Sequence, residues 1–98
     1  MKLSELLDNS KLENDVEISG ITADSRQVKP GFMFVALPGL VFNGADFIGK
    51  AIEAGAAAIL SIPEAKLDNN HVVWVLDDYP GRLFPHIVSR FFKSQPKN

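Results

Sequence analysis

Two polar segments of the sequence combine residue types that could bind a phosphorylated ligand. The first, Thr22–Arg26, places a hydroxyl, a carboxylate and a guanidinium together directly after a predicted strand. The second, Gly39–Gly44, follows the next predicted strand and leads into a predicted helix. Ligands in open α/β sheets usually bind beyond the carboxyl ends of strands, and helix amino termini favour anions. The hydroxyl of Ser25 together with free backbone amides would therefore suit a diphosphate.

The second segment also contains an apolar triplet, Leu40-Val41-Phe42, which could pack against a flat base. A simpler interpretation remains open for both segments. Asp24 and Arg26 could form no more than a salt-bridged turn, and the second loop could merely pack on the core.

A third segment, Gly44–Ala51, matches a phosphate-binding P-loop up to its last position. The P-loop needs a Ser or Thr hydroxyl there to hold magnesium, and this sequence has Ala51. Phe47 and Ile48 also fall on the apolar face of a predicted helix. We therefore expect an ordinary amphipathic helix that binds no ATP by itself.

Other reactive side chains have structural explanations. Asp77 and Asp78 follow a predicted strand and precede a helix, so we expect them to cap the helix rather than to catalyse acid–base chemistry or bind metal. His71 and His86 have no second ligand at a metal-binding spacing. The serine of Thr22–Arg26 lacks the strained nucleophile elbow of a hydrolase triad. The sequence thus predicts no catalytic residue and no metal ligand.

Turn and cap signals delimit the elements that must position these loops. Pro30-Gly31 is a strong turn signal before a continuous apolar run. Ser4 is the expected N-cap of a short opening helix. Asn43 or Asp46 is the expected cap of the helix that follows the second polar loop.

The order of the predicted elements indicates an α/β fold with a small sheet of about four to five strands flanked by helices. Continuous apolar runs fit strands that are covered on both faces. Pro85 interrupts the pattern of the last helix, which we expect to begin near Arg82 or Leu83 so that the proline falls in its first turn. Strands are predicted near residues 16–22, as two short strands on either side of a kink or bulge at Gly20, and near residues 32–37, 56–62 and 72–76. Helices are predicted near residues 3–7, 47–55 and 83–92.

Length, composition and charge narrow the class of protein. The 98 residues suffice for one domain, 46% of them are hydrophobic, and there is no cysteine. A net charge of −2 argues against a nucleic-acid interface, which would be basic. No stretch approaches the roughly 20 apolar residues that span a bilayer, and the amino terminus lacks the apolar core of a secretory signal. We expect a cytoplasmic domain without nucleic-acid or membrane partners. The polar tail, residues 93–98, is as compatible with a linker to a further domain as with a true carboxyl terminus.

The two polar loops, in this order, resemble the amino-terminal domain of the Mur ligases, which build the peptide stem of bacterial peptidoglycan. The closing segment, with Arg90-Phe91-Phe92 and Pro96, is most similar to the MurE type, the UDP-N-acetylmuramoyl-tripeptide synthetases. MurF shares the first loop and is the nearest rival. The residues that carry the family resemblance are Asp24-Ser25-Arg26, Val28, Pro30-Gly31, Phe34-Val35-Ala36-Leu37, Gly39, Gly44, Phe47-Ile48, Ala51 and Gly55-Ala56.

The resemblance implies a domain that holds the uridine diphosphate end of a nucleotide-sugar substrate. Asp24 and Arg26 are implied to brace the first loop rather than to touch the ligand. Asn43 stands where MurE proteins commonly have aspartate, and the apolar triplet replaces residues that are often polar, so its contacts would be backbone or stacking contacts. The implied substrate-binding residues are Ala23, Ser25, Leu40, Val41 and Phe42.

For the full-length enzyme, the resemblance implies ATP-dependent amide-bond formation between UDP-MurNAc-L-Ala-D-Glu and a diamino acid. The substrate carboxylate would be phosphorylated, and the incoming amino group would attack the acyl phosphate. ATP, magnesium and the amino acid are implied to bind in other domains, so we expect this chain alone to hold no cofactor and to be inactive. Two alternatives remain open: the equivalent domain of MurF, and a non-enzymatic α/β interaction module.

Overall fold

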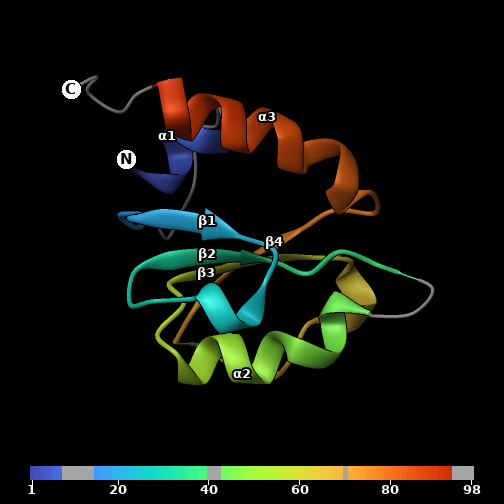
Figure 1. The fold of residues 1–98 in the computed structure, drawn as a ribbon. Helices are drawn as coiled ribbons and strands as arrows, with labels where there is room; N and C mark the ends of the chain where they lie inside the picture. Colours follow the sequence, from blue (N-terminus) through green and yellow to red (C-terminus); the bar gives the residue numbers. More distant parts are fainter. Residues whose placement is uncertain (8–14, 40–42, 70, 94–98) are drawn as a thin grey trace.

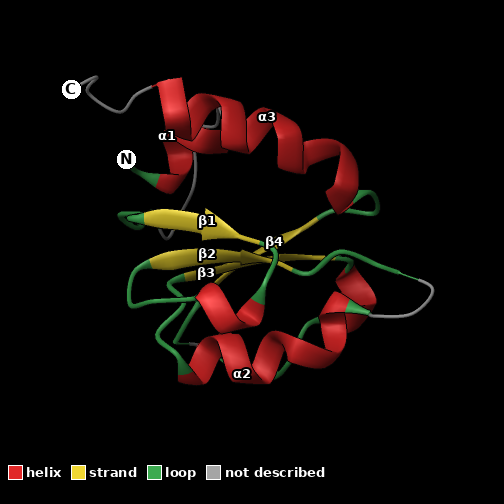
Figure 2. Cartoon of the chain, in the orientation of Figure 1, coloured by secondary structure: helices red, strands yellow, loops and turns green. Residues whose placement is uncertain are grey.

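The computed structural model describes residues 1–7, 15–39, 43–69 and 71–93, which form a sheet with helices on both faces (Figure 1, Figure 2). The sheet has four parallel strands in the order β1-β2-β3-β4. The helices α1 and α3 cover one face, and α2 covers the other. The predicted α/β class is confirmed. The elements are α1 (Leu3–Leu7), β1 (Gly20–Thr22), the 3₁₀ turn η1 (Ser25–Gln27), β2 (Phe32–Val35), the 3₁₀ turn η2 (Gly44–Phe47), α2 (Ile48–Glu53), β3 (Ala58–Ser61), the 3₁₀ turn η3 (Pro63–Ala65), β4 (Val73–Leu76) and α3 (Pro80–Lys93).

The central strands β2 and β3 are buried because helices cover both of their faces. Successive side chains of a strand point to opposite faces. Met33 therefore belongs to one hydrophobic cluster with Ile87 of α3, whereas its neighbour Phe34 belongs to a second cluster with Ile48 of α2. Ile59 of β3 joins the second cluster, beside Phe34. Two separate cores thus explain why these strands read as continuous apolar runs.

A tight turn sets the register of β2 against β1. The backbone N–H of Phe32 donates to the carbonyl of Lys29 at 3.0 Å, with Pro30 and Gly31 at the two central positions. Gly31 has φ +89°, the left-handed conformation that a type II turn requires at its third residue. The turn places Phe32 opposite Gly20, and the predicted Pro-Gly turn is confirmed.

The predicted opening helix is present, but its predicted N-cap is wrong. Ser4 lies inside α1 rather than before it. The start of the helix is instead closed by Glu5, whose Oε1 accepts from the backbone N–H of Lys2 at 2.9 Å. Ser4 does not cap the helix because its hydroxyl donates to Asp15, at 2.6 Å, from a distant part of the sequence.

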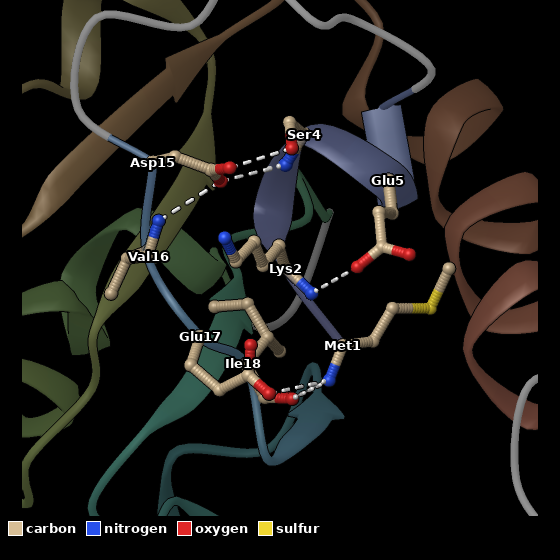
Figure 3. Close-up of polar contacts among 8 residues, drawn as sticks. All are labelled: Met1, Lys2, Ser4, Glu5, Asp15, Val16, Glu17 and Ile18. Atoms are coloured by element: carbon tan, nitrogen blue, oxygen red, sulfur yellow. Dashed lines mark hydrogen bonds and ion pairs between the residues drawn. The ribbon is translucent and has the colours of Figure 1, made fainter.

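Polar contacts fasten the amino terminus to the segment that precedes β1 (Figure 3). The backbone N–H and the hydroxyl of Ser4 donate to the two carboxylate oxygens of Asp15 at 3.0 and 2.6 Å. The α-amino group of Met1 forms an ion pair with Glu17 Oε1 at 3.2 Å. We call these four residues the N-terminal clasp. It holds α1 against the sheet with groups that lie at the surface.

The last helix begins earlier than its sequence pattern indicates. α3 starts at Pro80 rather than near Arg82 or Leu83, so Pro85 lies in its interior. Proline lacks the N–H that would bond the carbonyl of Gly81. Both residues are exposed, so water can meet that carbonyl. In the part of the chain that the structure describes, no helix is long and apolar enough to cross a membrane.

Candidate functional site

A cavity of about 560 Å³ lies at the carboxyl ends of β1 and β2. Its walls come from the loop after β1, the loop after β2, and the start of α2. This is the end of a parallel sheet at which ligands bind in open α/β folds. The first polar segment therefore meets, at one site, the residues Pro38 and Gly44 that lie on either side of the apolar triplet. The lining residues are Ala23, Asp24, Ser25, Arg26, Leu37, Pro38, Gly44, Phe47 and Lys50.

The first wall is braced by Asp24 and Arg26. The carboxylate of Asp24 accepts from the backbone N–H of Arg26 at 2.9 Å and from its guanidinium at 2.9 and 3.1 Å. These hydrogen bonds lower the pKa of Asp24 below its ordinary value and raise the pKa of Arg26. The bracing role expected for this pair agrees with the geometry. The salt-bridged turn of the simpler interpretation is also present, but it forms the wall of a cavity.

The two expected contact residues of this wall both line the cavity. Ala23 follows the last residue of β1 and Ser25 opens η1. The hydroxyl of Ser25 makes no hydrogen bond within residues 15–39 or the other described ranges, although its neighbours Thr22 and Asp24 both do. Ser25 therefore presents a polar group that no described residue satisfies.

The second wall depends on a close approach between Gly44 and the chain after β2. The backbone N–H of Gly44 donates to the carbonyl of Leu37 at 2.8 Å. A Cβ at this glycine would lie 2.5 Å from the backbone nitrogen of Leu37, so another residue would displace the wall. Glycine is required here for space, because its backbone contact holds the start of η2 against β2.

The helix amino terminus does not offer the free amides that the sequence predicted. Asn43, one of the two expected caps, caps the turn η2 rather than the helix α2: its side-chain oxygen accepts from Ala45 N at 3.2 Å, whereas α2 has Phe47 at its N-cap without a side-chain hydrogen bond. The carbonyl of Asn43 accepts from Asp46 N at 3.0 Å, and Ile48 N donates to the carbonyl of Ala45. Asp46 is not the cap. The expectation of an anion site on these amides was wrong, because the turn η2 uses them.

Phe47 and Lys50 complete the second wall and were not predicted as site residues. The Lys50 ammonium lies 5.8 Å from the centroid of the Phe47 ring. Both residues line the cavity. The available signal was their spacing of three, which places two residues on one helix face, but the apolar pattern of the same helix concealed it.

The remaining predicted contacts, Leu40, Val41 and Phe42, lie outside the described residues. Pro38 and Gly44, which lie on either side of this triplet in the sequence, line the cavity.

The segment Gly44–Ala51 does not fit a nucleoside triphosphate with magnesium. Ile48 and Ala51 are buried against the sheet, and the amides of η2 are already bonded. The predicted amphipathic helix is confirmed. Across residues 1–7, 15–39, 43–69 and 71–93, no group of three or more His, Cys, Asp or Glu side chains could hold a metal ion.

Asp77 closes the turn before α3 rather than forming the expected helix cap. Its carboxylate accepts from the backbone N–H of Tyr79 at 2.7 Å, immediately before α3. Asp78 is exposed. Neither residue lines the cavity, so the paired carboxylates are not part of the candidate site.

The sequence resembles a family of known proteins over most of its length. The family model described as "Mur ligase family, catalytic domain" matches residues 17–95. The chain is 41% identical over 87 residues to the UDP-N-acetylmuramoyl-L-alanyl-D-glutamate–2,6-diaminopimelate ligase of Zymomonas mobilis. This match covers 89% of this chain and 18% of that protein. It is 40% identical over 83 residues to the UDP-N-acetylmuramyl-tripeptide synthetase of Borreliella afzelii, covering 84% and 16%. The chain thus spans less than one fifth of these relatives.

Solved structures show the same fold. MurF from Acinetobacter baumannii superposes with a TM-score of 0.62 at 15% identity, over 86% of this chain and 17% of that chain. MurF from Thermotoga maritima, solved in complex with ADP, superposes with a TM-score of 0.59 at 27% identity, over 68% and 15%. The likeness to the first of these supports the fold alone.

Proposed function

The chain belongs to the Mur ligase family, and we propose that it is the amino-terminal, UDP-anchoring domain of a MurE-type ligase. The full-length protein would join a diamino acid to UDP-MurNAc-L-Ala-D-Glu in the cytoplasm, driven by ATP. ATP, magnesium and the amino acid would bind in its other domains. The 98-residue chain would therefore bind substrate without catalysing the reaction.

The observation that carries this proposal is the cavity between the two polar loops. Its volume, about 560 Å³, lies within the range of roughly 300–1,000 Å³ that is usual for small-molecule sites. Ser25 offers an unsatisfied hydroxyl, which suits a phosphate oxygen. Ala23, Leu37 and Phe47 provide apolar surface suited to a base or a ribose.

Anchoring the remote end of a substrate supports a reaction that takes place elsewhere. Binding energy from a non-reacting part of the substrate can position the reacting carboxylate and reduce the entropy lost at the reacting centre. The hydrogen bond from the backbone N–H of Arg26 to Asp24 serves this purpose because it holds the turn that carries Ser25 in place before the ligand arrives.

The experiment that tests the proposal is titration of the chain with UDP, followed by NMR and calorimetry. We expect shifts at residues 22–26 and 43–50. Ser25→Ala should weaken UDP binding roughly five- to tenfold because a hydrogen bond to a charged phosphate is lost. Ser89→Ala, at an exposed position of α3, is the matched control and should bind UDP normally. No shift at millimolar UDP would instead favour an interaction module.

The MurF alternative differs in its substrate. The curated relatives carry the MurE reaction in their names, at about 40% identity, whereas the MurF structures are less similar in sequence. MurE is therefore the preferred assignment. Turnover by the full-length protein of the dipeptide-bearing nucleotide, and not of the tripeptide-bearing one, would support it; the opposite preference would assign MurF.

A further inference from the structure

Two cations line the cavity, and a carboxylate engages one of them. The guanidinium of Arg26 is held by Asp24 at 2.9 and 3.1 Å. Lys50 forms no ion pair with any carboxylate in the described ranges; Glu53, three residues further along α2, does not pair with it. The uncompensated positive charge of the cavity wall is therefore that of Lys50.

The fold restrains where this ammonium lies. Ile48 and Ala51 are fully buried and fix one face of α2 against the sheet. Phe47 and Lys50, three residues apart, share the face that lines the cavity. The Phe47 ring lies 5.8 Å from the ammonium, a distance at which the ring attracts the cation. In Figure 1, the turn η1 that carries Ser25 lies beside α2, on the same side of the sheet.

An anion bound in this cavity needs a positively charged side chain close to it. The amides of Gly44, Ala45 and Asp46 are bonded within the protein, so they are not free to bind a phosphate. The chain carries a net charge of −2, so its overall field does not favour an anionic ligand. A local cation must supply that attraction.

We propose that Lys50 is a specificity-determining residue that binds the phosphate groups of a nucleoside diphosphate, on the opposite wall of the cavity from Ser25. This inference rests on the proposed function and goes beyond it. Ser25 offers a directional hydrogen bond from the loop after β1, and Lys50 offers a compact positive charge from α2. Lys50 supplies the part of the preference for a nucleoside diphosphate over the nucleoside that depends on charge, whereas the apolar wall binds both.

The test compares UDP with uridine by NMR titration of the 98-residue chain, using two lysine variants. Lys50→Gln should weaken UDP binding about tenfold, reduce its dependence on salt, and leave uridine binding unchanged. Lys66→Gln is the matched control. Lys66 also lies over an aromatic ring, Trp74, at 5.6 Å, but it does not line the cavity. This variant should bind both ligands as the unaltered chain does.

Each other outcome contradicts a definite part of the inference. Equal UDP affinity for Lys50→Gln and Lys66→Gln would overturn the role of Lys50 and leave the proposed function standing. Equal losses for UDP and uridine in Lys50→Gln would show that the residue only supports the wall. Absence of UDP binding by the unaltered chain would overturn both proposals. Lys50→Arg should restore most of the UDP affinity if charge is the cause.

Discussion

The N-terminal clasp and the cavity are both built around a surface aspartate, yet they use their polar groups differently. In the clasp, the hydroxyl and amide of Ser4 hold Asp15 and lower its pKa. In the cavity, the guanidinium and amide of Arg26 hold Asp24 and lower its pKa. The clasp thus satisfies its groups internally. The cavity, by contrast, has a polar group that is free to bind a ligand, because the hydroxyl of Ser25 has no hydrogen-bond partner in the described ranges.

This difference separates polar contacts that stabilise a fold from those that prepare a site. A surface hydrogen bond that is already formed in the free protein stabilises the native state and adds nothing to ligand binding. An unsatisfied group beside a rigid brace can form a new bond with a ligand at little cost in ordering. The two aspartates have similar local chemistry, but only one lies beside groups that remain available.

The largest expected effect on UDP binding and on stability comes from a substitution that distorts the cavity wall and leaves the N-terminal clasp intact. Gly44→Ala places a Cβ 2.5 Å from a backbone nitrogen. We expect UDP binding to be lost and the free energy of unfolding to fall by about 1–3 kcal/mol, as overpacking does. Urea denaturation and NMR titration measure both.

Gly49→Ala is the matched control for that change. Gly49 is an exposed residue of α2, and a Cβ added to it would meet no atom within 4 Å. Alanine should raise the free energy of unfolding by up to about 1 kcal/mol because it favours helix. Similar destabilisation by both variants would show that crowding at Gly44 is not the cause.

A smaller effect is expected when the cavity brace loses its charge. In Asp24→Asn, the amide oxygen can still cap η1, but the guanidinium of Arg26 is no longer neutralised. We expect UDP affinity to rise about two- to threefold, because a carboxylate leaves the cavity wall and a cation is freed. Calorimetry with Asp46→Asn as a control for net charge measures this. A loss of affinity would show that the ion pair itself is needed to position Ser25.

The smallest expected effect, on stability alone, comes from a substitution that breaks the N-terminal clasp and leaves the cavity intact. The folded pKa of Asp15 lies below its ordinary value of 3.8, so its stabilising contribution is present above that value and is lost as the pH falls through the folded pKa. Asp15→Asn should lower stability at neutral pH, and the difference from the unaltered chain should narrow below about pH 4.

Thermal denaturation at several pH values tests this dependence, and Asp68→Asn, at an exposed loop position, is the control. UDP affinity should remain unchanged in both variants. A difference for Asp15→Asn that stays constant through the acid range would contradict the assigned role of its charge.

Much of the fold was predictable because its signals are local. The turn at Pro30-Gly31 follows from the backbone preferences of two adjacent residues. The alternation of Met33 and Phe34 between two cores follows from the geometry of a strand. The N-cap at Ser4 was wrong because a residue eleven positions away, Asp15, binds its hydroxyl, and no local pattern reveals such a partner.

The sequence by itself determined the α/β class, the segments at the ends of β1 and β2 that flank the cavity, and the pairing of Asp24 with Arg26 two residues away. Only the tertiary structure decided which groups remain available. In the folded chain, the amides of Gly44, Ala45 and Asp46 form hydrogen bonds at the turn η2, and Lys50 lies in the cavity wall. The physical reason is that a short-range bond depends on neighbouring residues, whereas the freedom of a polar group depends on every segment that packs around it.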